Sequence, residues 1–397
     1  MKRSTFGTAL AVTAMVLGGL APVAAWAAPS PTGALHAVHA CASPAPGTAA
    51  CDAMHLVDSN GADPRTTAPP STGLTPALLQ DAYKLTGLAS GGRTVAIVDA
   101  YGYANLERDL GVYRAQFGLP ACTTANGCLK IVDQNGGTSY PRANTGWAQE
   151  QALDVQTVSA ACPDCKILVV QAKSTSFADL GAAVNTAARS AGVVAISNSY
   201  GGSDAPDSTY GAAYNHPGIA VTASTGDNGF QGASFPASSA YVTAVGGTSL
   251  VRASGTARGW SESVWSGAGS GCSTYNAALS AASSFGTGCT GRAMADVSAA
   301  ADPANGGMAI YYPTSTRSST WGQWGGTSES APLIAAVYAL SGNTSGYANA
   351  LPYQHAASLF DVTSGSNGSC SPVQMCTARA GWDGPTGLGT PNGVTAF

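Results

Sequence analysis

Short apolar runs rich in β-branched residues alternate with helical stretches along most of the chain, and this alternation constrains the fold more than any other feature. The runs indicate strands at 93–102, 128–134, 165–172, 193–202, 219–227 and 241–250. Helices are expected at 75–85, from Thr145 onward, at 176–192 and at 327–342. Because the runs are apolar throughout and separated by helices, we predict an α/β fold with a mostly parallel central sheet and helices on both faces.

The N-terminus has the form of a secretory signal peptide. Lys2 and Arg3 precede an apolar stretch at 9–23, and Ala25-Trp26-Ala27 supplies a cleavage site of the A-x-A type. We therefore predict a signal peptide at 1–27 and a secreted protein. No later apolar run is long enough to span a bilayer, so no membrane partner is expected.

The chain is poor in charge. Only 10% of its residues are Asp, Glu, Lys or Arg, compared with about 25% in an average domain. The formal net charge is -4, and no basic stripe favours a nucleic-acid partner. A surface with few ionisable groups is compatible with function in acid. We expect a monomer that binds no nucleic acid.

The cysteines agree with export. Ten are present, and in sequence order they form five close neighbours: Cys41 and Cys51, Cys122 and Cys128, Cys162 and Cys165, Cys272 and Cys289, Cys370 and Cys376. An even count in a secreted chain indicates disulfides, and local pairing is the simplest arrangement, although sequence alone does not fix it. Cys162-Pro-Asp-Cys165 also has the form of a redox or zinc site. A structural disulfide is favoured because no second such pair or nearby histidine completes a zinc set.

Composition divides the remaining chain in two. Residues 28–72 are rich in Ala, Pro, Ser, Thr and Gly, and we interpret them as a short, poorly ordered leader with a small Cys41–Cys51 loop. Residues 73–397 carry the regular pattern and form the predicted folded domain. Within it, the Gly/Ser/Ala-rich span 253–290 is expected to form long loops joined by Cys272 and Cys289.

The stretch Gly325-Gly-Thr-Ser-Glu-Ser-Ala-Pro-Leu333 places Ser328 at a junction between loop and helix. Free backbone N–H groups and the positive end of the helix dipole suit a nucleophile whose product is an oxyanion. The alternative is that Ser328 or Thr327 only caps the helix.

Carboxylates lie where a base for Ser328 would be needed. Glu150 and Asp154 stand one turn apart on one predicted helix, a like-charge pair that costs a helix about 0.2–0.5 kcal/mol. Asp99 and Asp227 lie near the carboxyl ends of two predicted strands, and sites in α/β sheets collect at such ends. The five histidines are His36, His39, His55, His216 and His355. None stands in a His-Gly-Thr motif at the start of a helix, so Ser328 has no evident imidazole base.

Taken together, these stretches resemble the sedolisins, the serine-carboxyl peptidases with a subtilisin-like fold. The resemblance is carried by Glu150-Gln-Ala-Leu-Asp154, Ser224-Thr-Gly-Asp227 and Gly326-Thr-Ser328-Glu-Ser-Ala-Pro332, and covers roughly residues 74–397. Each motif alone is weak, but all occur in order at plausible spacing. The resemblance implies an endopeptidase that hydrolyses proteins or peptides at acidic pH.

The resemblance also implies roles for residues. Ser328 would be the nucleophile, Glu150 the general base, Asp154 the partner that holds Glu150 and shares its proton, and Asp227 a member of the oxyanion hole. Asp99 could extend the carboxylate chain, the alternative being a turn cap. Further substrate-binding candidates are Ser199, Tyr200 and Gly201, where a peptide would pair by β-addition.

The C-terminal part resembles the segments of the sedolisins that surround one calcium ion. The expected ligands are the carboxylates of Asp361 and Asp383 and the carbonyls of Val362, Arg379 and Gly381, an oxygen shell of the kind calcium prefers. Arg379 stands where the family often has glycine, and its cation would weaken binding.

Several alternatives stay open at this stage. Sedolisins usually carry a long folded prodomain, and the residues between Ala28 and the catalytic pattern are too few for one. How activity is controlled is therefore open. The enzyme could be a tripeptidyl-peptidase of the same family or a subtilisin-type Asp-His-Ser peptidase, although the latter lacks a credible histidine. An inactive relative that acts as a binding protein is the alternative from another class.

Overall fold

The computed structural model describes residues 35–397 apart from 65 and 344, so the predicted signal peptide lies outside the described residues. Its main sheet has eight strands. In spatial order these are β12 (Trp260–Val264), β11 (Thr243–Arg252), β9 (Ala220–Ser224), β7 (Val193–Asn198), β4 (Thr94–Ala100), β6 (Lys166–Ala172) and β5 (Leu129–Asp133), and β15 (Val297–Ala300) also pairs with β11. All pairs are parallel except β11 with β12. The predicted mostly parallel sheet is confirmed.

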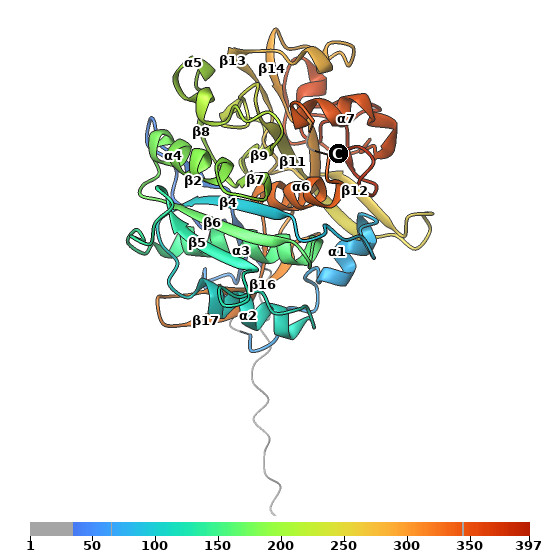
Figure 1. Ribbon diagram of the computed structural model, residues 1–397. Helices are drawn as coiled ribbons and strands as arrows, with labels where there is room; N and C mark the ends of the chain where they lie inside the picture. Colours follow the sequence, from blue (N-terminus) through green and yellow to red (C-terminus); the bar gives the residue numbers. More distant parts are fainter. Residues whose placement is uncertain (1–34, 65, 344) are drawn as a thin grey trace, which may run out of the picture. The chain divides into compact units, whose positions relative to one another are not determined.

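Helices cover both faces of this sheet. On one face lie α1 (Pro76–Ala82), α2 (Leu106–Gln116), α3 (Thr145–Ala161) and α6 (Thr327–Ser341), and on the other lies α4 (Phe177–Ala188). Figure 1 shows α4 and α3 on opposite sides of β4, β6 and β5. Along β4, Val95 and Ile97 pack on the face covered by α1, α2, α3 and α6. Ala96 and Val98 pack on the opposite face, which α4 covers. An apolar residue is therefore needed at every position of the strand.

The helix starts follow from local chemistry. Thr75 caps α1 as predicted, since its side chain accepts a hydrogen bond from the Leu78 N–H. Asn144 caps α3 by accepting from the Trp147 N–H at 3.1 Å. The residue before α6 is Gly326, with φ of 97° and no side-chain cap. The alternative that Thr327 or Ser328 only caps this helix is therefore wrong.

Two stretches differ from the predicted pattern. The expected strand at 193–202 is interrupted at Ser199, so β7 is followed by a separate strand, β8 (Tyr200–Ser203). The span 253–290 is not all loop, because it contains β12 and β13 (Gly271–Ala277), which pairs with β14 (Gly291–Met294). Gly, Ser and Ala carry little β-propensity, and the hydrogen bonds with partner strands override it.

The described part of the leader is not poorly ordered. It forms β1 (His36–His39), β2 (Ala50–Cys51) and β3 (Met54–Val57). β1 pairs with β3, β3 pairs with β17 (Ser319–Gly325), and β2 pairs with β8. β16 (Met308–Pro313) completes the sheet β1-β3-β17-β16. These strands are too short to produce a visible pattern, and main-chain bonds rather than side-chain periodicity fix them.

The remaining α-helices and strands are short. They are the helices α5 (Asp207–Tyr210) and α7 (Leu351–Gln354) and the two-residue strands β10 (Ser234–Phe235), β18 (Leu359–Phe360) and β19 (Thr390–Pro391). Within the described ranges, no helix has the length and apolar character needed to cross a bilayer.

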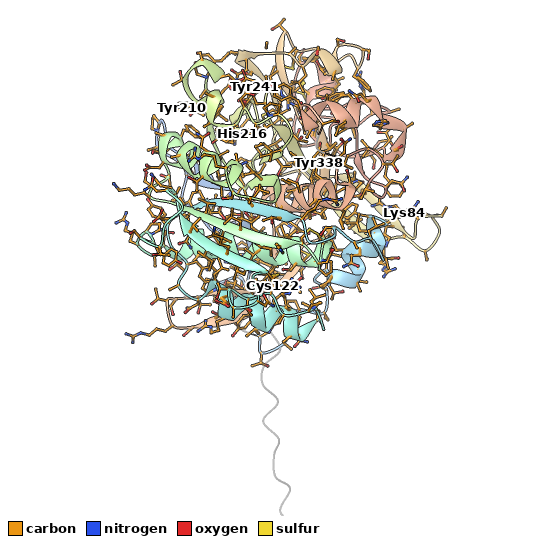
Figure 2. The ribbon with its side chains drawn as sticks, in the orientation of Figure 1. Lys84, Cys122, Tyr210, His216, Tyr241 and Tyr338 are labelled. Atoms are coloured by element: carbon orange, nitrogen blue, oxygen red, sulfur yellow. A yellow bond between two sulfur atoms is a disulfide. The ribbon has the colours of Figure 1, made fainter. Side chains whose placement is uncertain are left out.

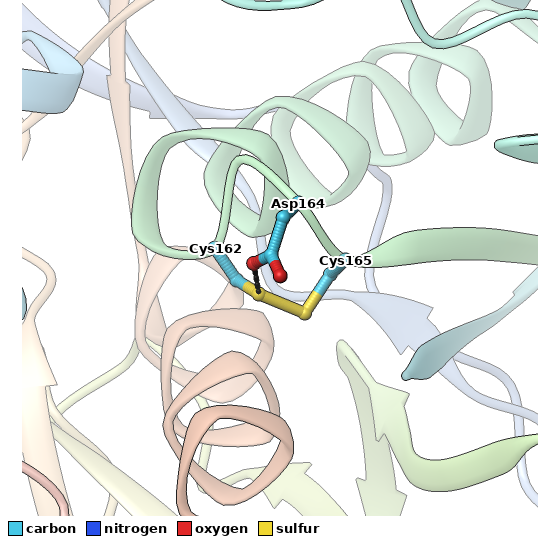
Figure 3. Close-up of side chains that lie close together, drawn as sticks. All are labelled: Cys162, Asp164 and Cys165. Atoms are coloured by element: carbon cyan, nitrogen blue, oxygen red, sulfur yellow. Dashed lines mark hydrogen bonds between the residues drawn. A yellow bond between two sulfur atoms is a disulfide. The ribbon is translucent and has the colours of Figure 1, made fainter. Parts of the chain in front are cut away.

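All five disulfides join sequence neighbours, as the simplest pairing predicts. The Cys162–Cys165 bond closes the turn that follows α3, and Figure 3 shows Asp164 beside it. Asp164 accepts hydrogen bonds from the backbone N–H groups of Ser90 and Gly91. Because both sulfurs are bonded to each other, this CxxC is a structural disulfide and not a zinc site.

Two helical valines test how much the core beneath the sheet stabilises the fold. Val158 in α3 is fully buried, whereas Val112 in α2 is 37% exposed. We expect Val158→Ala to lower the free energy of unfolding by about 2 kcal/mol, through lost burial and a residual cavity. Val112→Ala, with the same change of helix propensity, should cost less than about 0.5 kcal/mol. Urea denaturation followed by tryptophan fluorescence measures both, and equal losses would contradict this assignment of the core.

Candidate active site

Ser328 is buried at the start of α6, where β17 ends and Gly326 turns the chain. Its hydroxyl lies 3.4 Å from the carbonyl oxygen of Ser199. Gly326 has a positive φ, and a Cβ there would come within 2.1 Å of the Asp52 carbonyl oxygen and 2.4 Å of Asp227 Oδ2. Only glycine therefore lets both groups approach the start of the helix.

Glu150 and Asp154 lie one turn apart on α3, which packs against α6, and both are fully buried. Neither carboxyl oxygen of Glu150 has a hydrogen-bond partner of ordinary geometry in the described chain, although the Ser328 hydroxyl and the Asp154 carboxyl lie near it. Burial raises the pKa of Glu150 well above its ordinary value, and the charges of Asp154 and Asp99 raise it further. Asp154 Oδ1 accepts a hydrogen bond from the Ser199 hydroxyl at 2.8 Å.

Asp99 lies at the end of β4 and extends this line of carboxyl groups. It is fully buried, and no N–H or hydroxyl of the described residues donates to it. Its hydrogen bond with Asp154 therefore requires that one of the two carboxyls holds a proton. Burial raises the pKa of Asp99 and also that of Asp154. Glu150 thus lies near Ser328, Asp154 near Glu150, and Asp99 near Asp154.

Asp227 follows β9 and lies against Thr327 at the start of α6. Its Oδ1 accepts hydrogen bonds from the backbone N–H and the hydroxyl of Thr327, at 2.7 and 2.8 Å. Its Oδ2 has no hydrogen-bond partner in the described part of the chain. Burial raises the pKa of Asp227, and the nearby carboxyl of Asp52 raises it further. A protonated Asp227 can therefore donate a hydrogen bond next to Ser328.

Asp52 is a buried member of the site that the sequence did not reveal. The Ser224 hydroxyl donates to its Oδ2 at 2.6 Å. Burial raises the pKa of Asp52 to about 7, although this hydrogen bond acts against the shift. Asp52 lies in the segment expected to be a loose leader, and its one sequence signal is its position next to Cys51.

The three candidate substrate-binding residues have different surroundings. Ser199 presents its carbonyl to the Ser328 hydroxyl and its own hydroxyl to Asp154. Tyr200 turns its ring into the core, where its hydroxyl donates to Asn198, and its backbone pairs with Cys51 of β2. Gly201 lines a hollow of about 340 Å³, together with Ser203, Asp227 and Asp52.

None of the five histidines serves Ser328. His55 pairs with Asp63 at 2.9 Å and stacks on Trp324. The Nε2 of His216, labelled in Figure 2, lies 3.0 Å from the Ala213 carbonyl. No hydrogen bond joins His36, His39 or His355 to Ser328 or Glu150 among the described residues. The subtilisin-type alternative therefore has no base in this structure.

The predicted calcium ligands lie together in the C-terminal part of the chain. The Asp361 carboxylate accepts from the Gly381 N–H at 2.9 Å, and Asp383 accepts from the N–H and hydroxyl of Thr386. Burial raises the pKa of Asp383 to about 7, and the charge of Asp361 contributes. Arg379 directs its side chain away, to the carbonyls of Trp382 and Gly286.

These residues fit a calcium ion. Two carboxylates lie close together with no cation paired to either in the described chain, which favours binding of a cation. No backbone hydrogen bond is made to the carbonyl oxygens of Val362, Arg379 or Gly381, so these remain available as ligands. Calcium prefers such a set of oxygen ligands.

Comparison with known proteins agrees with this geometry. The model of the subtilase family matches residues 140–365, which include Glu150, Asp154, Asp227 and Ser328. Kumamolisin from Bacillus sp. (strain MN-32) is 32% identical over 365 residues, covering 81% of this chain and 63% of kumamolisin. Tripeptidyl-peptidase sed1 from Aspergillus fumigatus is 38% identical over 113 residues, covering 26% of this chain and 16% of that protein. The chain thus spans less than two thirds of the length of these relatives.

Solved structures show the same fold. A Pseudomonas sedolisin, a serine-carboxyl proteinase complexed with two molecules of pseudo-iodotyrostatin, superimposes with a TM-score of 0.66 and 23% identity. The match covers 81% of this chain and 96% of that one. Sphericase gives a TM-score of 0.53 at 18% identity, over 82% and 99%. The chain belongs to the subtilase family, and within that fold it is a member of the sedolisins.

Proposed function

We propose that the protein is a secreted serine-carboxyl endopeptidase that hydrolyses peptide bonds of proteins at acidic pH. The observation that carries the proposal is the burial of the Ser328 hydroxyl near Glu150, with Asp154 one turn further along α3. A hydroxyl next to a carboxylate base and a separate donor for the oxyanion is the minimum that acyl transfer requires.

In the proposed reaction, Ser328 Oγ attacks the carbonyl carbon of the substrate while its proton passes to Glu150. Asp154 holds Glu150 in position through their shared proton. The oxyanion accepts hydrogen bonds from the Ser328 N–H and from protonated Asp227. Glu150 then gives its proton to the leaving amine as the C–N bond breaks. Water hydrolyses the acyl-enzyme by the same steps in reverse.

The acidic pH follows from the protonation states that this scheme needs. Asp227 must hold a proton to donate, and burial raises its pKa to favour that form. Glu150 must be ionised when it accepts the proton. The coupled carboxyl groups must therefore hold, between them, fewer protons than there are carboxyl groups. Imidazole would be protonated in acid and unable to act as the base, whereas a carboxylate still can. At alkaline pH the donor at Asp227 is lost.

The edge of β8 supports a peptide substrate. A chain that takes the place of β2 beside Ser199, Tyr200 and Gly201 would form main-chain hydrogen bonds without regard to its side chains. The intact catalytic set argues against an inactive binding protein. A tripeptidyl-peptidase remains the second candidate function, and the printed name of the Aspergillus fumigatus relative is the observation in its favour.

We also propose that the Asp361/Asp383 site binds one structural calcium ion, that the protein is secreted and that it is a monomer without nucleic-acid or membrane partners. The ion would neutralise two adjacent carboxylates and join the chain before β19 to the segment after β18. The five disulfides support an oxidising compartment.

Replacing the base tests the proposed mechanism. Glu150→Gln should lower kcat on a denatured protein substrate by at least about 100-fold, because the amide cannot accept the Ser328 proton. The matched control is Glu329→Gln, since Glu329 is also buried with a raised pKa but its carboxyl makes no hydrogen bond to Ser328. Product analysis from pH about 3 to about 8 also separates internal cleavage from tripeptide release. Activity that rises toward alkaline pH, or survives in Glu150→Gln, would contradict the proposal.

The buried carboxyls should also make folding stability depend on pH. A carboxyl whose pKa is raised in the folded protein stabilises it below the unfolded pKa and loses that contribution as pH rises. For Asp52 the window runs from 3.8 to about 7. Backbone hydrogen bonds lower the pKa of Asp133 below 3.8. Its contribution to stability therefore changes only below pH 3.8 and does not oppose the expected fall above it.

We therefore expect the thermal unfolding midpoint to fall as pH rises from 3.8 to about 7, with a smaller fall in Asp52→Asn. Differential scanning fluorimetry in buffers of constant ionic strength measures this slope. A midpoint that rises through the window, or an unchanged slope in the variant, would show that these carboxyls do not hold protons in the folded state.

Calcium should raise the thermal unfolding midpoint, because an ion that binds only the folded state stabilises it by RT ln(1 + [L]/Kd). A chelator should reverse the increase. Asp361→Asn should lose the response while Asp204→Asn, whose carboxylate bonds to Ser273 and Thr274 instead, should keep it. An equal calcium response in both variants would place the ion elsewhere.

A further inference from the structure

Helix α3 carries the acid pair, but its directional bonds to other elements are made by glutamines. Gln149, Gln151 and Gln156 are all buried, and each bonds to the backbone of another element. The carboxyl of Glu150 has no hydrogen-bond partner of ordinary geometry in the described chain, so it does not anchor the helix. Hydrophobic contacts are non-directional, whereas a hydrogen bond has a preferred length and angle. The glutamines are therefore the groups that fix where Glu150 lies.

Gln156 joins α3 to the outer edge of β16. Its Nε2 donates to the Tyr311 carbonyl at 2.6 Å, and its Oε1 accepts from the Tyr311 N–H at 2.9 Å. The side-chain amide thus pairs with both backbone groups of one residue, as a neighbouring strand would. β16 is the outermost strand of the sheet β1-β3-β17-β16, and Gln156 takes the place of a neighbour at that edge.

Two further bonds complete the same edge. Gln149, about two turns earlier on the same side of α3, donates to the Pro313 carbonyl at 3.0 Å. Proline has no N–H, so Pro313 needs only a donor. Nearer the start of β16, the Ala309 N–H donates to the Leu74 carbonyl at 3.0 Å. Because Ala309, Tyr311 and Pro313 alternate along the strand, these bonds pair all three outward-facing positions.

This edge belongs to the strand pair that leads to Ser328. β16 pairs with β17 over its whole length. β17 ends at Gly325, and Gly326 then turns the chain into α6, which carries Ser328. The bonds of Gln149 and Gln156 therefore join the helix of the proposed base to the strands that place the proposed nucleophile.

Gln151 holds α3 on the other side of the acid pair. Its Nε2 donates to the Tyr101 carbonyl at 3.2 Å, directly after β4. The Gln171 side chain donates to its Oε1 at 2.9 Å. At about 100° of rotation per residue, Glu150 and Asp154 lie on α3 between Gln151 and the side that faces β16. The helix is thus held on both sides of the acids.

We propose that Gln156 is a positioning residue for Glu150, with Gln149 as a second and weaker anchor. Gln156 acts by fixing α3 against β16 and β17, so that the Glu150 carboxyl lies near the Ser328 hydroxyl. This inference rests on the proposed function. A displacement of a reacting group by about 1 Å can cost about 100-fold in rate. Loss of these bonds should therefore lower kcat and leave KM unchanged.

Gln156→Met tests the assignment, because methionine has a similar length but no N–H donor and only a weak acceptor. We expect kcat on an added peptide in acid to fall at least about tenfold, with KM changed less than about twofold. Gln149→Met removes one bond and should give a smaller fall in kcat. The matched control is Gln80→Met, since Gln80 of α1 bonds to the Ala160 carbonyl at the far end of α3. Its loss should leave kcat unchanged.

Gln156→Glu provides a rescue that depends on protonation. A protonated carboxyl has one O–H donor and one carbonyl acceptor, as the amide has, whereas a carboxylate has no donor for the Tyr311 carbonyl. The kcat of this variant divided by that of the unsubstituted protein should be close to one in acid and fall as pH rises. The midpoint of this fall, though not its direction, depends on titratable groups packed around α3, among them Glu150, Asp154 and Asp99, Tyr113 and Arg114 of α2, Tyr311 of β16 and Glu329 of α6.

Thermal unfolding shows which variants are folded at the assay temperature, and kcat is compared only among those. A folded Gln156→Met with unchanged kcat would overturn the inference, as would an equal loss in Gln80→Met or a Gln156→Glu ratio that does not change with pH. If Gln156→Met does not fold, Gln149→Met and Gln156→Glu decide. An unsubstituted protein that cleaves no peptide at any pH would overturn the proposed function as well.

Discussion

The site depends on the burial of carboxyl groups that have no cation to neutralise them. Among the described residues, no Lys or Arg forms an ion pair with Asp99, Glu150, Asp154 or Asp227. The core does pair a buried carboxylate elsewhere, where Arg292 and Asp296 lie together. Since an unpaired buried charge is far costlier than a neutral carboxyl, the cluster holds protons. Because the same carboxyl groups must hold protons for folding and for the proposed reaction, both depend on acidic pH.

The fold brings these carboxyls together from elements distant in sequence. Asp99 ends a central strand, Glu150 and Asp154 share one face of α3, and Asp227 follows β9. Parallel strands place their carboxyl ends at one edge, which is why Asp99 and Asp227 converge. Ser328 meets them because Gly326 permits a close turn before α6. The like-charge spacing that weakens an isolated helix is harmless when one member of the pair is protonated.

What the sequence could predict follows from the kind of interaction involved. The strands of the main sheet and the helices around them follow side-chain patterns, and the catalytic candidates lie in motifs with fixed spacing, so both were visible. Asp52 was not, because β2 is held by main-chain hydrogen bonds and a disulfide, neither of which imposes a periodic pattern. The break at Ser199 was hidden for a similar reason, since the chain stays extended on both sides of it. β12 and β13 were missed because their partners, not their composition, make them strands.

The position of Ala49–Asp52 changes what limits access to the cleft. A tethered segment competes with external peptide at an effective concentration that reaches millimolar for short links. β3 and its pairing with β17 hold the segment next to β8. A peptide that pairs with β8 at Tyr200 and Gly201 must therefore displace this segment.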